Sequence, residues 1–288
     1  MDFLSLDPLL KQALQEDLGR GDITTEAILG MSGPSRGGAI RAQAVLLAKE
    51  NFVLAGWPIF VRVFQLLGEV EAQTRFEEGA QVEQESTVGK LSGAASVLLR
   101  GERVAMNFLQ RMSGVATQTR KYVKLVAHTT AKVLDTRKTT PLWRSLEKYA
   151  VRTGGGFNHR LGLDDGILIK ENHIAMAGGI GAALDACRSR MNHLHKIEIE
   201  VRNLEELSQA INAGAEVLLL DNMTTKQVQE AVKIAKGRCV LEVSGGVNES
   251  NIVEYAEAGV DLISLGILTH SSPSVDLSVS LHKYDDVC

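Results

Sequence analysis

The spacing of apolar residues changes along the chain, and each change marks a different kind of element. Near the N-terminus, apolar residues recur at helical spacing between Leu10 and Leu18. Asp7 is a residue type that caps helices, Pro8 suits a first helical position, and Gly19 suits a helix end. The pattern therefore predicts a first helix that begins beside Asp7 and ends at Gly19.

Short extended runs replace this spacing between about residues 36 and 91. The runs AIRAQAVLLA and EVEAQTRF are separated by glycines, a pattern typical of a mixed α/β layer. Helical spacing returns over residues 94–127, where Val104 and Arg103 fall on different faces. The Ser113-Gly114 pair predicts a break within this second long helix.

After about residue 130, apolar runs end in polar or glycine residues at regular intervals. From Lys170 onward the intervals are between 21 and 30 residues, the length of one strand plus one helix. The segments AINAGAEVLLL and YAEAGVDLISL resemble each other, and their glycines, Gly214 and Gly259, stand between a helix and a strand. The residues that follow the apolar runs are Arg137, Lys170, Glu200, Asp221, Ser244 and Gly266.

These repeats predict a parallel sheet of βα units. In a parallel α/β barrel, functional groups project from the C-terminal ends of the strands and meet at one mouth. We expect an α/β protein with an N-terminal sandwich-like α/β domain over residues 1–115 and a C-terminal parallel βα barrel, complete or open, over residues 116–270. Residues 271–288 are expected to return to the first domain. An open doubly wound sheet is the competing architecture.

Composition is that of an ordinary globular protein, with 44% hydrophobic and 23% charged residues among 288. The N-terminal stretch lacks a cationic segment followed by an apolar one, so no signal peptide is expected. Apolar runs stay short of the roughly 18 residues that span a membrane. Cys187, Cys239 and Cys288 show no metal or redox spacing and fit reduced thiols in the cytoplasm.

Positive charge is concentrated in one segment. The chain has a formal net charge of −4, yet residues 137–170 contain seven Lys or Arg and three Asp or Glu. A local cationic pocket favours a small polyanion over nucleic acid, which needs a broad basic face. Arg137, Arg160 and Lys170 stand at strand ends or beside a glycine run, so we interpret them as ligand-binding residues.

Two carboxylates, Glu200 and Asp221, end consecutive strands amid these cations. Hard cations prefer oxygen ligands and bridge to phosphates, so the pair predicts a Mg²⁺ site, with hydrogen bonding to ribose hydroxyls as an alternative or additional role. Glu198 lies two residues earlier on the same strand face and is expected to fill the barrel. The elements Ser244-Gly245-Gly246 and Gly266 offer backbone N–H groups to a phosphate.

Eight motifs, in this order, resemble one protein family: EDLGRGDITTEAI, TRKTTP, LEKYAVRTGGGFNHR, ILIKENH, IEIEV, LLLDNM, LEVSGG and SLGILTHS. Over nearly its whole length the chain resembles the quinolinate phosphoribosyltransferases. It departs from the family pattern at Leu142, where glycine is common, and at Val243 and Ile267, where alanine is more usual.

The resemblance implies transfer of a phosphoribosyl group from 5-phosphoribosyl 1-pyrophosphate to quinolinate, with decarboxylation to nicotinate mononucleotide for NAD synthesis. It implies a substrate site made of Thr136, Arg137, Lys138, His159, Arg160, Lys170, Glu200 and Asp221. Within that set it implies catalytic roles for Lys138, Lys170, Glu200 and Asp221. It also implies a phosphate contact at His270. Finally, it implies a homodimer in which Arg103 crosses to the site of the other subunit.

Three alternatives stay open. The first is a related phosphoribosyltransferase tied to molybdate use or to a single-carboxylate pyridine, although the number of cations favours a dicarboxylate. The second is a non-catalytic metabolite sensor, which would gain nothing from Glu200 and Asp221. The third is a nucleic-acid binder, disfavoured by an aromatic content of 5%. Arg144, Lys148 and Arg152, spaced around Glu147, fit a site or helix-surface pairing equally.

Overall fold

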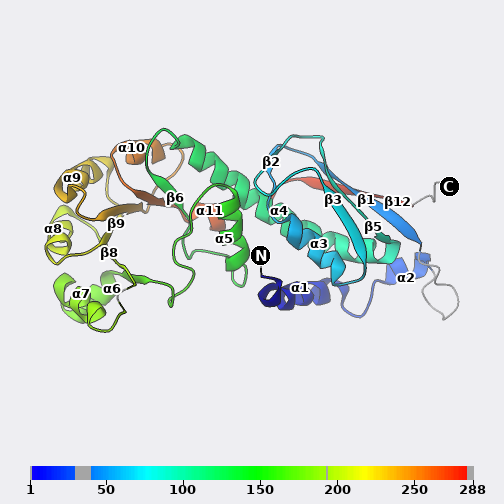
Figure 1. The fold of residues 1–288 in the computed structure, drawn as a ribbon, viewed down its shortest axis with the longest axis horizontal. Coiled ribbons are helices and arrows are strands. Elements are labelled where there is room, and N and C mark those ends of the chain that lie inside the picture. The colour runs from blue at the N-terminus through cyan, green and yellow to red at the C-terminus, as the bar shows by residue number, and fades with distance from the viewer. Residues whose placement is uncertain (1, 30–39, 193, 284–288) are drawn as a thin grey trace. The chain divides into compact units, whose positions relative to one another are not determined.

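The computed structural model describes residues 2–29, 40–192 and 194–283 of a chain that divides into two compact units (Figure 1). One unit contains residues 1–117 with 272–288, and the other contains residues 118–271. The C-terminal tail thus belongs to the first unit. The described residues leave out residues 36–39 of the expected extended region. They also leave out residues 284–288 of the tail, which include Cys288.

The first helix starts well before the position that its sequence pattern suggests. Helix α1 spans Phe3–Leu18, and the side chain of Asp2 caps it. Asp7 does not cap the helix but accepts a hydrogen bond from Arg62 Nε at 2.9 Å, so the predicted start is wrong. The early start adds Leu6 to the buried stripe of the helix, and this burial offsets the cost of a proline in its interior.

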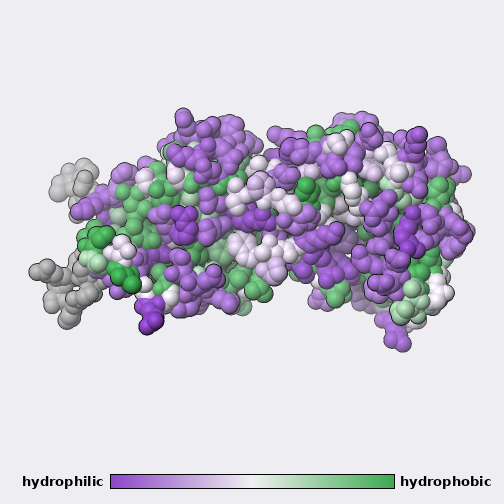
Figure 2. Space-filling model, turned by 180° about the vertical axis from the view of Figure 1, so that it is seen from behind, coloured by the Kyte–Doolittle hydropathy of each residue, from purple (hydrophilic) through white to green (hydrophobic). Residues whose placement is uncertain are grey.

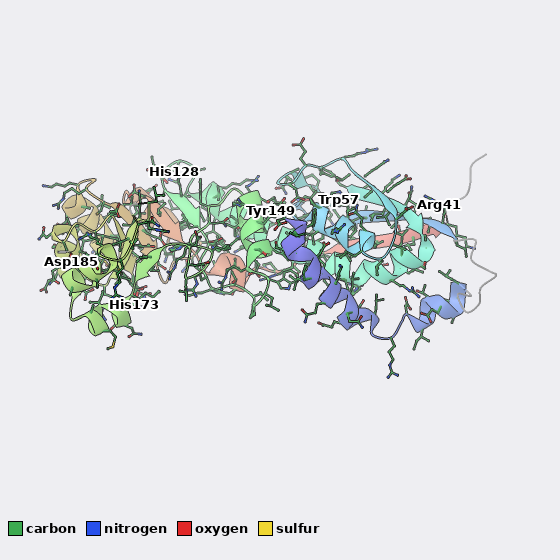
Figure 3. The ribbon with its side chains drawn as sticks, turned by 60° about the horizontal axis from the view of Figure 1, so that its bottom comes forward. Arg41, Trp57, His128, Tyr149, His173 and Asp185 are labelled. Carbon is green, nitrogen blue, oxygen red and sulfur yellow. The ribbon has the colours of Figure 1, made fainter. Side chains whose placement is uncertain are left out.

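A four-stranded antiparallel sheet, in the order β12-β1-β5-β3, forms the first unit with its helices. Its strands are β1 (Arg41–Ala48), β3 (Val70–Thr74), β5 (Thr87–Ala94) and β12 (Leu277–Lys283). The short strands β2 (Phe52–Val53) and β4 (Gln81–Val82) pair separately, and the helices are α2 (Ile23–Leu29) and α3 (Trp57–Gln65). Trp57, labelled in Figure 3, lies in α3, and its ring stacks on that of Phe60 with centroids 5.2 Å apart.

Helix α4 (Ala95–Leu125) continues without a break from the first unit into the second. The predicted interruption at Ser113-Gly114 is therefore wrong. Ser113 Oγ accepts a hydrogen bond from Ala55 N–H at 3.1 Å, and a Cβ atom on Gly114 would lie 1.8 Å from the carbonyl oxygen of Pro273. These two small residues let neighbouring backbone approach the helix, and they do not bend it.

The second unit is built on a six-stranded parallel sheet in the order β6-β11-β10-β9-β8-β7. The strands are β6 (Lys132–Leu134), β7 (Ile167–Ile169), β8 (Ile197–Val201), β9 (Val217–Asp221), β10 (Val240–Ser244) and β11 (Leu262–Ser264). The first strand pairs with the last and the others follow in sequence, as in a ring. Leu134 of β6 also forms an isolated parallel bridge with Phe157, which lies between β6 and β7 in the sequence. The expected α/β class with a βα barrel is confirmed, and the sheet has no doubly wound switch point.

Helices alternate with these strands, as the intervals of the sequence predict. They are α5 (Arg144–Thr153), α6 (Glu171–Ala177), α7 (Ile180–Arg188), α8 (Leu204–Asn212), α9 (Thr225–Ala235), α10 (Ile252–Glu257) and α11 (Ile267–His270). Helices α7, α8, α9 and α10 form a layer along the outside of the sheet (Figure 1). Gly214 and Gly259 have φ values of 76° and 95°, so both follow a helix in the left-handed conformation expected there.

The surface of the described residues is mixed in polarity. On the face drawn in Figure 2, hydrophilic residues predominate and hydrophobic ones form separate patches. Among the helices in the described parts of the chain, none combines the length and the apolar character that crossing a membrane requires.

Candidate active site

A cavity of about 760 Å³ opens at the C-terminal ends of the parallel strands. Of the site residues that the sequence predicts, the cavity is lined by Thr136, Arg137, Lys138, His159, Arg160, Lys170, Glu200, Asp221, Ser244, Gly245, Gly246, Gly266 and His270. Arg103 is not among them: its side chain is exposed on the part of α4 that belongs to the first unit. The barrel topology thus converts six separate strand ends into one concave surface.

Two guanidinium groups in this cavity have buried Nε atoms without a hydrogen-bond acceptor among the described residues: those of Arg137 and Arg160. Arg160 keeps one bond, from Nη1 to the carbonyl oxygen of Gly166 at 2.9 Å. Burial, and then the positive charge of Arg137, lower the pKa of Arg160. Two guanidinium groups that repel each other and still have free N–H donors are suited to bind an anion between them, above all a carboxylate.

A buried ion pair holds the segment that carries Arg160. Lys148 Nζ lies 2.5 Å from Asp135 Oδ1 and 2.8 Å from the carbonyl oxygen of His159. Asp135 also accepts from the Asn158 side chain at 2.6 Å and from His159 N–H at 2.8 Å. Burial raises the pKa of Asp135 and lowers that of Lys148, and the dense hydrogen bonding opposes both effects. Lys148 is 3% exposed, so the helix-surface interpretation of this residue is wrong.

The neighbours of Lys148 on α5 brace the loop after β6. Glu147 is buried and accepts from the backbone N–H of Thr140 at 3.0 Å and from its hydroxyl at 2.9 Å. Arg144 donates to Thr139 Oγ1 at 3.0 Å and to the carbonyl oxygen of Arg137 at 3.4 Å. Both residues therefore shape the cavity wall through the loop and do not pair with each other on the helix surface. Arg152, by contrast, is exposed.

This loop also contains the departure from the family pattern at Leu142. Trp143 N–H donates to the carbonyl oxygen of Thr140 at 3.0 Å, which closes a turn with Pro141 second and Leu142 third. Leu142 has a φ of 67° and its side chain is 76% exposed. A third turn residue with positive φ is a position that favours glycine. Leucine is therefore strained here without compensating burial.

His159 lines the cavity, yet both of its ring nitrogens are engaged by the protein. Nδ1 accepts a hydrogen bond from Arg160 N–H at 2.7 Å. Nε2 lies 3.1 Å from Glu198 Oε2 and 3.6 Å from Glu242 Oε1. Burial would lower the pKa of His159, but the two carboxylates outweigh it and raise the pKa. A second proton on Nδ1 would nevertheless face the Arg160 N–H, so this hydrogen bond favours the neutral imidazole with its proton on Nε2.

The two predicted carboxylates lie on adjacent strands at the mouth. Glu200, in β8, accepts from Lys170 Nζ at 3.2 Å, and Asp221, the last residue of β9, accepts from Asn222 Nδ2 at 2.9 Å. Both carboxylates line the cavity and neither is fully buried. Two oxygen donors at an open mouth fit Mg²⁺, which commonly takes one or two carboxylates and completes its shell with water and phosphate oxygens.

Glycine loops after β10 and β11 form another part of the cavity wall. Gly245 and Gly246 have φ values of 85° and 66°, and a Cβ atom on Gly245 would lie 2.3 Å from Asn222 Oδ1. Within the described chain, the backbone N–H groups of Gly245, Gly246 and Gly266 donate to no other residue. A Cβ atom on Gly266 would lie 3.0 Å from Lys138 Cδ, so glycine there leaves room for this lysine. Free N–H groups on backbone of this shape suit a phosphate.

Among the cavity-lining residues that the sequence did not single out, one is ionisable: Glu242. It lies in β10, is 1% exposed, and points to the same side of the strand as Ser244. Burial and the nearby charge of Glu198 raise its pKa to about 7. The signal that could have revealed it is a glutamate inside the apolar run CVLEV, two residues before the strand end.

Models of a known family match both parts of the chain. The quinolinate phosphoribosyl transferase C-terminal domain matches residues 115–280, and the N-terminal domain of the same family matches residues 22–113. The chain belongs to the quinolinate phosphoribosyltransferase family. This confirms the resemblance that its motifs indicate.

Individual relatives agree along nearly the full length. A probable nicotinate-nucleotide pyrophosphorylase [carboxylating] from Synechocystis sp. is 43% identical over 97% of this chain and 93% of its own. The nicotinate-nucleotide pyrophosphorylase [carboxylating] of Homo sapiens is 35% identical over 96% of this chain and 94% of its own. The solved structure of the nicotinate-nucleotide pyrophosphorylase from Francisella tularensis is 38% identical and has a TM-score of 0.91, covering 98% of both chains.

Proposed function

We propose that this protein is a nicotinate-nucleotide pyrophosphorylase (carboxylating), which transfers phosphoribosyl from 5-phosphoribosyl 1-pyrophosphate to quinolinate. The observation that carries the proposal is the pair of guanidinium groups, Arg137 and Arg160, whose buried Nε atoms have no acceptor among the described residues. Quinolinate is a dianion with two adjacent carboxylates, and arginine forks bind carboxylates bidentately. Lys170, at the end of β7, supplies a third positive charge.

The chemistry follows from position and charge. The pyridine nitrogen of quinolinate forms a bond to ribose C1 while the C1–oxygen bond breaks and pyrophosphate leaves with the bonding electrons. The C2–carboxylate bond then breaks, CO₂ leaves, and a proton takes its place on C2 to give nicotinate mononucleotide. No covalent nucleophile is needed. Glu200 and Asp221 face the cationic ribosyl centre, and Lys138 and Lys170 stabilise the negative charge that decarboxylation leaves on the ring.

The phosphoribosyl donor requires its own contacts. We assign its 5-phosphate to the loop Ser244-Gly245-Gly246 and to Gly266, whose glycine N–H groups are free among the described residues, with His270 beside them. Support comes from the left-handed glycines of this loop and from the room that Gly266 leaves for Lys138. Thr136, at the rim of the same cavity, is assigned to substrate contact through its hydroxyl.

We further propose that Mg²⁺ takes part, held by Glu200 and Asp221 and completed by water and pyrophosphate oxygens. When bound, the ion would neutralise the charge that develops on pyrophosphate as it leaves. The support is the donor set: two carboxylates on adjacent strands, each with its side chain at the cavity. Glu200 Oε2 also accepts from Lys170 Nζ at 3.2 Å, so the ion and this lysine would share one carboxylate.

We also propose a homodimer in which Arg103 completes the site of the other subunit. Arg103 is exposed on α4 and has no ion-pair partner among the described residues, so its charge is available. Two-fold dimers are the commonest oligomers, and their symmetry would complete two sites at once. We infer a cytoplasmic location as well, because Cys187 and Cys239 are free thiols, which fits a reducing compartment.

A substrate panel tests the proposal. Quinolinate should be consumed with 5-phosphoribosyl 1-pyrophosphate and Mg²⁺, and nicotinate, which lacks the C2 carboxylate, should react at least tenfold less well, because an unfilled charged site costs about 1.5 kcal/mol or more. Equal use of both pyridines would favour the alternative phosphoribosyltransferase, and tight binding of quinolinate without turnover would favour the metabolite sensor.

A further inference from the structure

Three ionisable side chains meet inside the barrel beneath the proposed quinolinate pocket: His159, Glu198 and Glu242. Their ligand-type atoms lie within 4.8 Å of one another. The two carboxylates come from β8 and β10, and both are buried. One oxygen of each, Glu198 Oε1 and Glu242 Oε1, is buried without a hydrogen-bond donor in the described part of the chain. Two unpaired carboxylate oxygens side by side require an explanation.

A metal ion is one explanation, but the histidine does not fit it. A histidine that binds a metal through one nitrogen donates its other N–H to a carbonyl or carboxylate. Here Nδ1 accepts from Arg160 N–H at 2.7 Å, so it carries no proton. The proton of the ring then sits on Nε2, which lies 3.1 Å from Glu198 Oε2 and donates to it. The nitrogen that faces the carboxylates is therefore a donor, and it is not free to bind a metal.

A proton on Glu242, which faces Glu198, is the explanation that fits. If Glu242 is a neutral acid, its hydroxyl donates to Glu198 and both unpaired oxygens are satisfied. Burial, then the charge of Glu198, raise the pKa of Glu242 to about 7, while His159 and the hydroxyl of Ser264 on β11 act in the opposite direction. The other charges that act on the cluster are Lys148 of α5 and Arg160. Leu219, which pairs with Glu242 from the strand between the two glutamates, is apolar.

We propose that Glu242 acts as a neutral carboxylic acid and is a positioning residue for quinolinate binding. Glu242 donates its proton to Glu198, and Glu198 accepts a hydrogen bond from His159 Nε2–H. His159 Nδ1 in turn accepts a hydrogen bond from the backbone N–H of Arg160. This chain of contacts fixes the position from which Arg160 reaches the cavity. The inference rests on the proposed function, because it assigns Arg160 to quinolinate.

The charge of the cluster matters as well as its geometry. With Glu242 neutral, the two glutamates together carry at most one negative charge. Loss of the Glu242 proton places a second negative charge below a pocket that must hold a dianion, and it also draws a proton onto His159 Nδ1, which breaks the contact with Arg160 N–H. Quinolinate binding should therefore weaken as Glu242 ionises, and the weakening should appear in KM before it appears in kcat.

The test compares Glu242→Gln with the natural protein across pH. Glutamine is neutral at every pH and keeps a donor for Glu198. At about pH 6 the variant should have the KM of the natural protein for quinolinate; toward about pH 8.5 the KM of the natural protein should rise roughly threefold to tenfold while that of the variant stays flat. At alkaline pH, Glu242→Gln should therefore bind quinolinate more tightly than the natural protein does. Glu257→Gln, which alters an exposed acid paired with His128, is the matched control and should keep the alkaline rise.

Two measurements on the ligand-free protein separate this inference from the proposed function. Infrared spectra of the natural protein should contain the carbonyl band of a buried carboxylic acid, and Glu242→Gln should lack it. The thermal stability of the natural protein should fall relative to that of Glu242→Gln as pH rises from about 4.5 to about 7, and the difference should then level off. Absence of the band, or a tenfold higher KM of Glu242→Gln at pH 6, would overturn the inference. Failure of the protein to use quinolinate would overturn the proposed function, and the infrared result would still decide whether Glu242 is protonated.

Discussion

Replacing Arg137 with methionine should separate ligand binding from stability. The Nε of Arg137 is buried without an acceptor, and the positive charge of Arg137 repels that of Arg160. In the ligand-free protein this side chain contributes no ion pair within the described residues. Methionine keeps the length and the apolar stem but removes the charge and the donors. The structure therefore predicts opposite effects on the two properties.

The change in KM follows from the hydrogen bond to quinolinate that would be lost, and the change in stability follows from the like-charge contact that would be relieved. One charge-assisted hydrogen bond contributes about 1.5–3 kcal/mol, so KM for quinolinate should rise roughly tenfold to 150-fold. The free energy of unfolding should be unchanged or higher by up to about 1 kcal/mol, because a like-charge contact is relieved. Arg152→Met is the control, since Arg152 is exposed on the neighbouring helix α5 and does not line the cavity.

Two assays read these effects. Initial rates with varied quinolinate give KM, and urea unfolding without ligand gives the free energy. Arg152→Met should match the natural protein in both. The reasoning is refuted if Arg137→Met keeps the natural KM, or if it loses more than about 1 kcal/mol of stability, as a residue with a structural partner would.

Three further predictions concern other parts of the site. Leu142→Gly should raise the free energy of unfolding by about 0.5–1 kcal/mol in urea unfolding, because it relieves a left-handed backbone at an exposed turn; no gain would mean that the turn is unstrained. Glu200→Gln and Asp221→Asn should each lower kcat and weaken the response to Mg²⁺ while calorimetry still detects quinolinate binding; natural rates at saturating Mg²⁺ would remove both roles. Inactive Arg103→Ala and inactive Lys170→Ala chains, mixed to exchange subunits, should recover activity through one intact site per heterodimer, whereas inactive verified heterodimers would place Arg103 outside the partner's site.

The strand ends were predictable from the sequence because parallel strands leave a strong pattern. An apolar run that stops at a polar residue every βα unit fixes both the strand and its functional end, and this is why Lys170, Glu200 and Asp221 lie at the cavity as expected. The left-handed conformation of Gly214 and Gly259 follows from local backbone preference alone. These features depend on residues close in sequence.

Other features depend on contacts between distant residues and were not predictable. The start of α1 depends on the burial of Leu6, and α4 is uninterrupted at Ser113, where a small residue lets other backbone approach the helix. On α5 the charges of Glu147 and Lys148 look like surface pairs, yet both face inward to a loop and a strand end. Spacing along one helix does not reveal which partner a buried charge finds across the fold.

We propose that this cavity joins quinolinate to phosphoribose and then removes the C2 carboxylate. Quinolinate labelled with ¹⁴C in that carboxylate tests it most directly. With 5-phosphoribosyl 1-pyrophosphate and Mg²⁺, we expect the label to be released as CO₂ in an amount equal to the nicotinate mononucleotide formed. Neither product should appear without the phosphoribosyl donor. Label that stays in a nucleotide product, or nucleotide formed without CO₂, would contradict it.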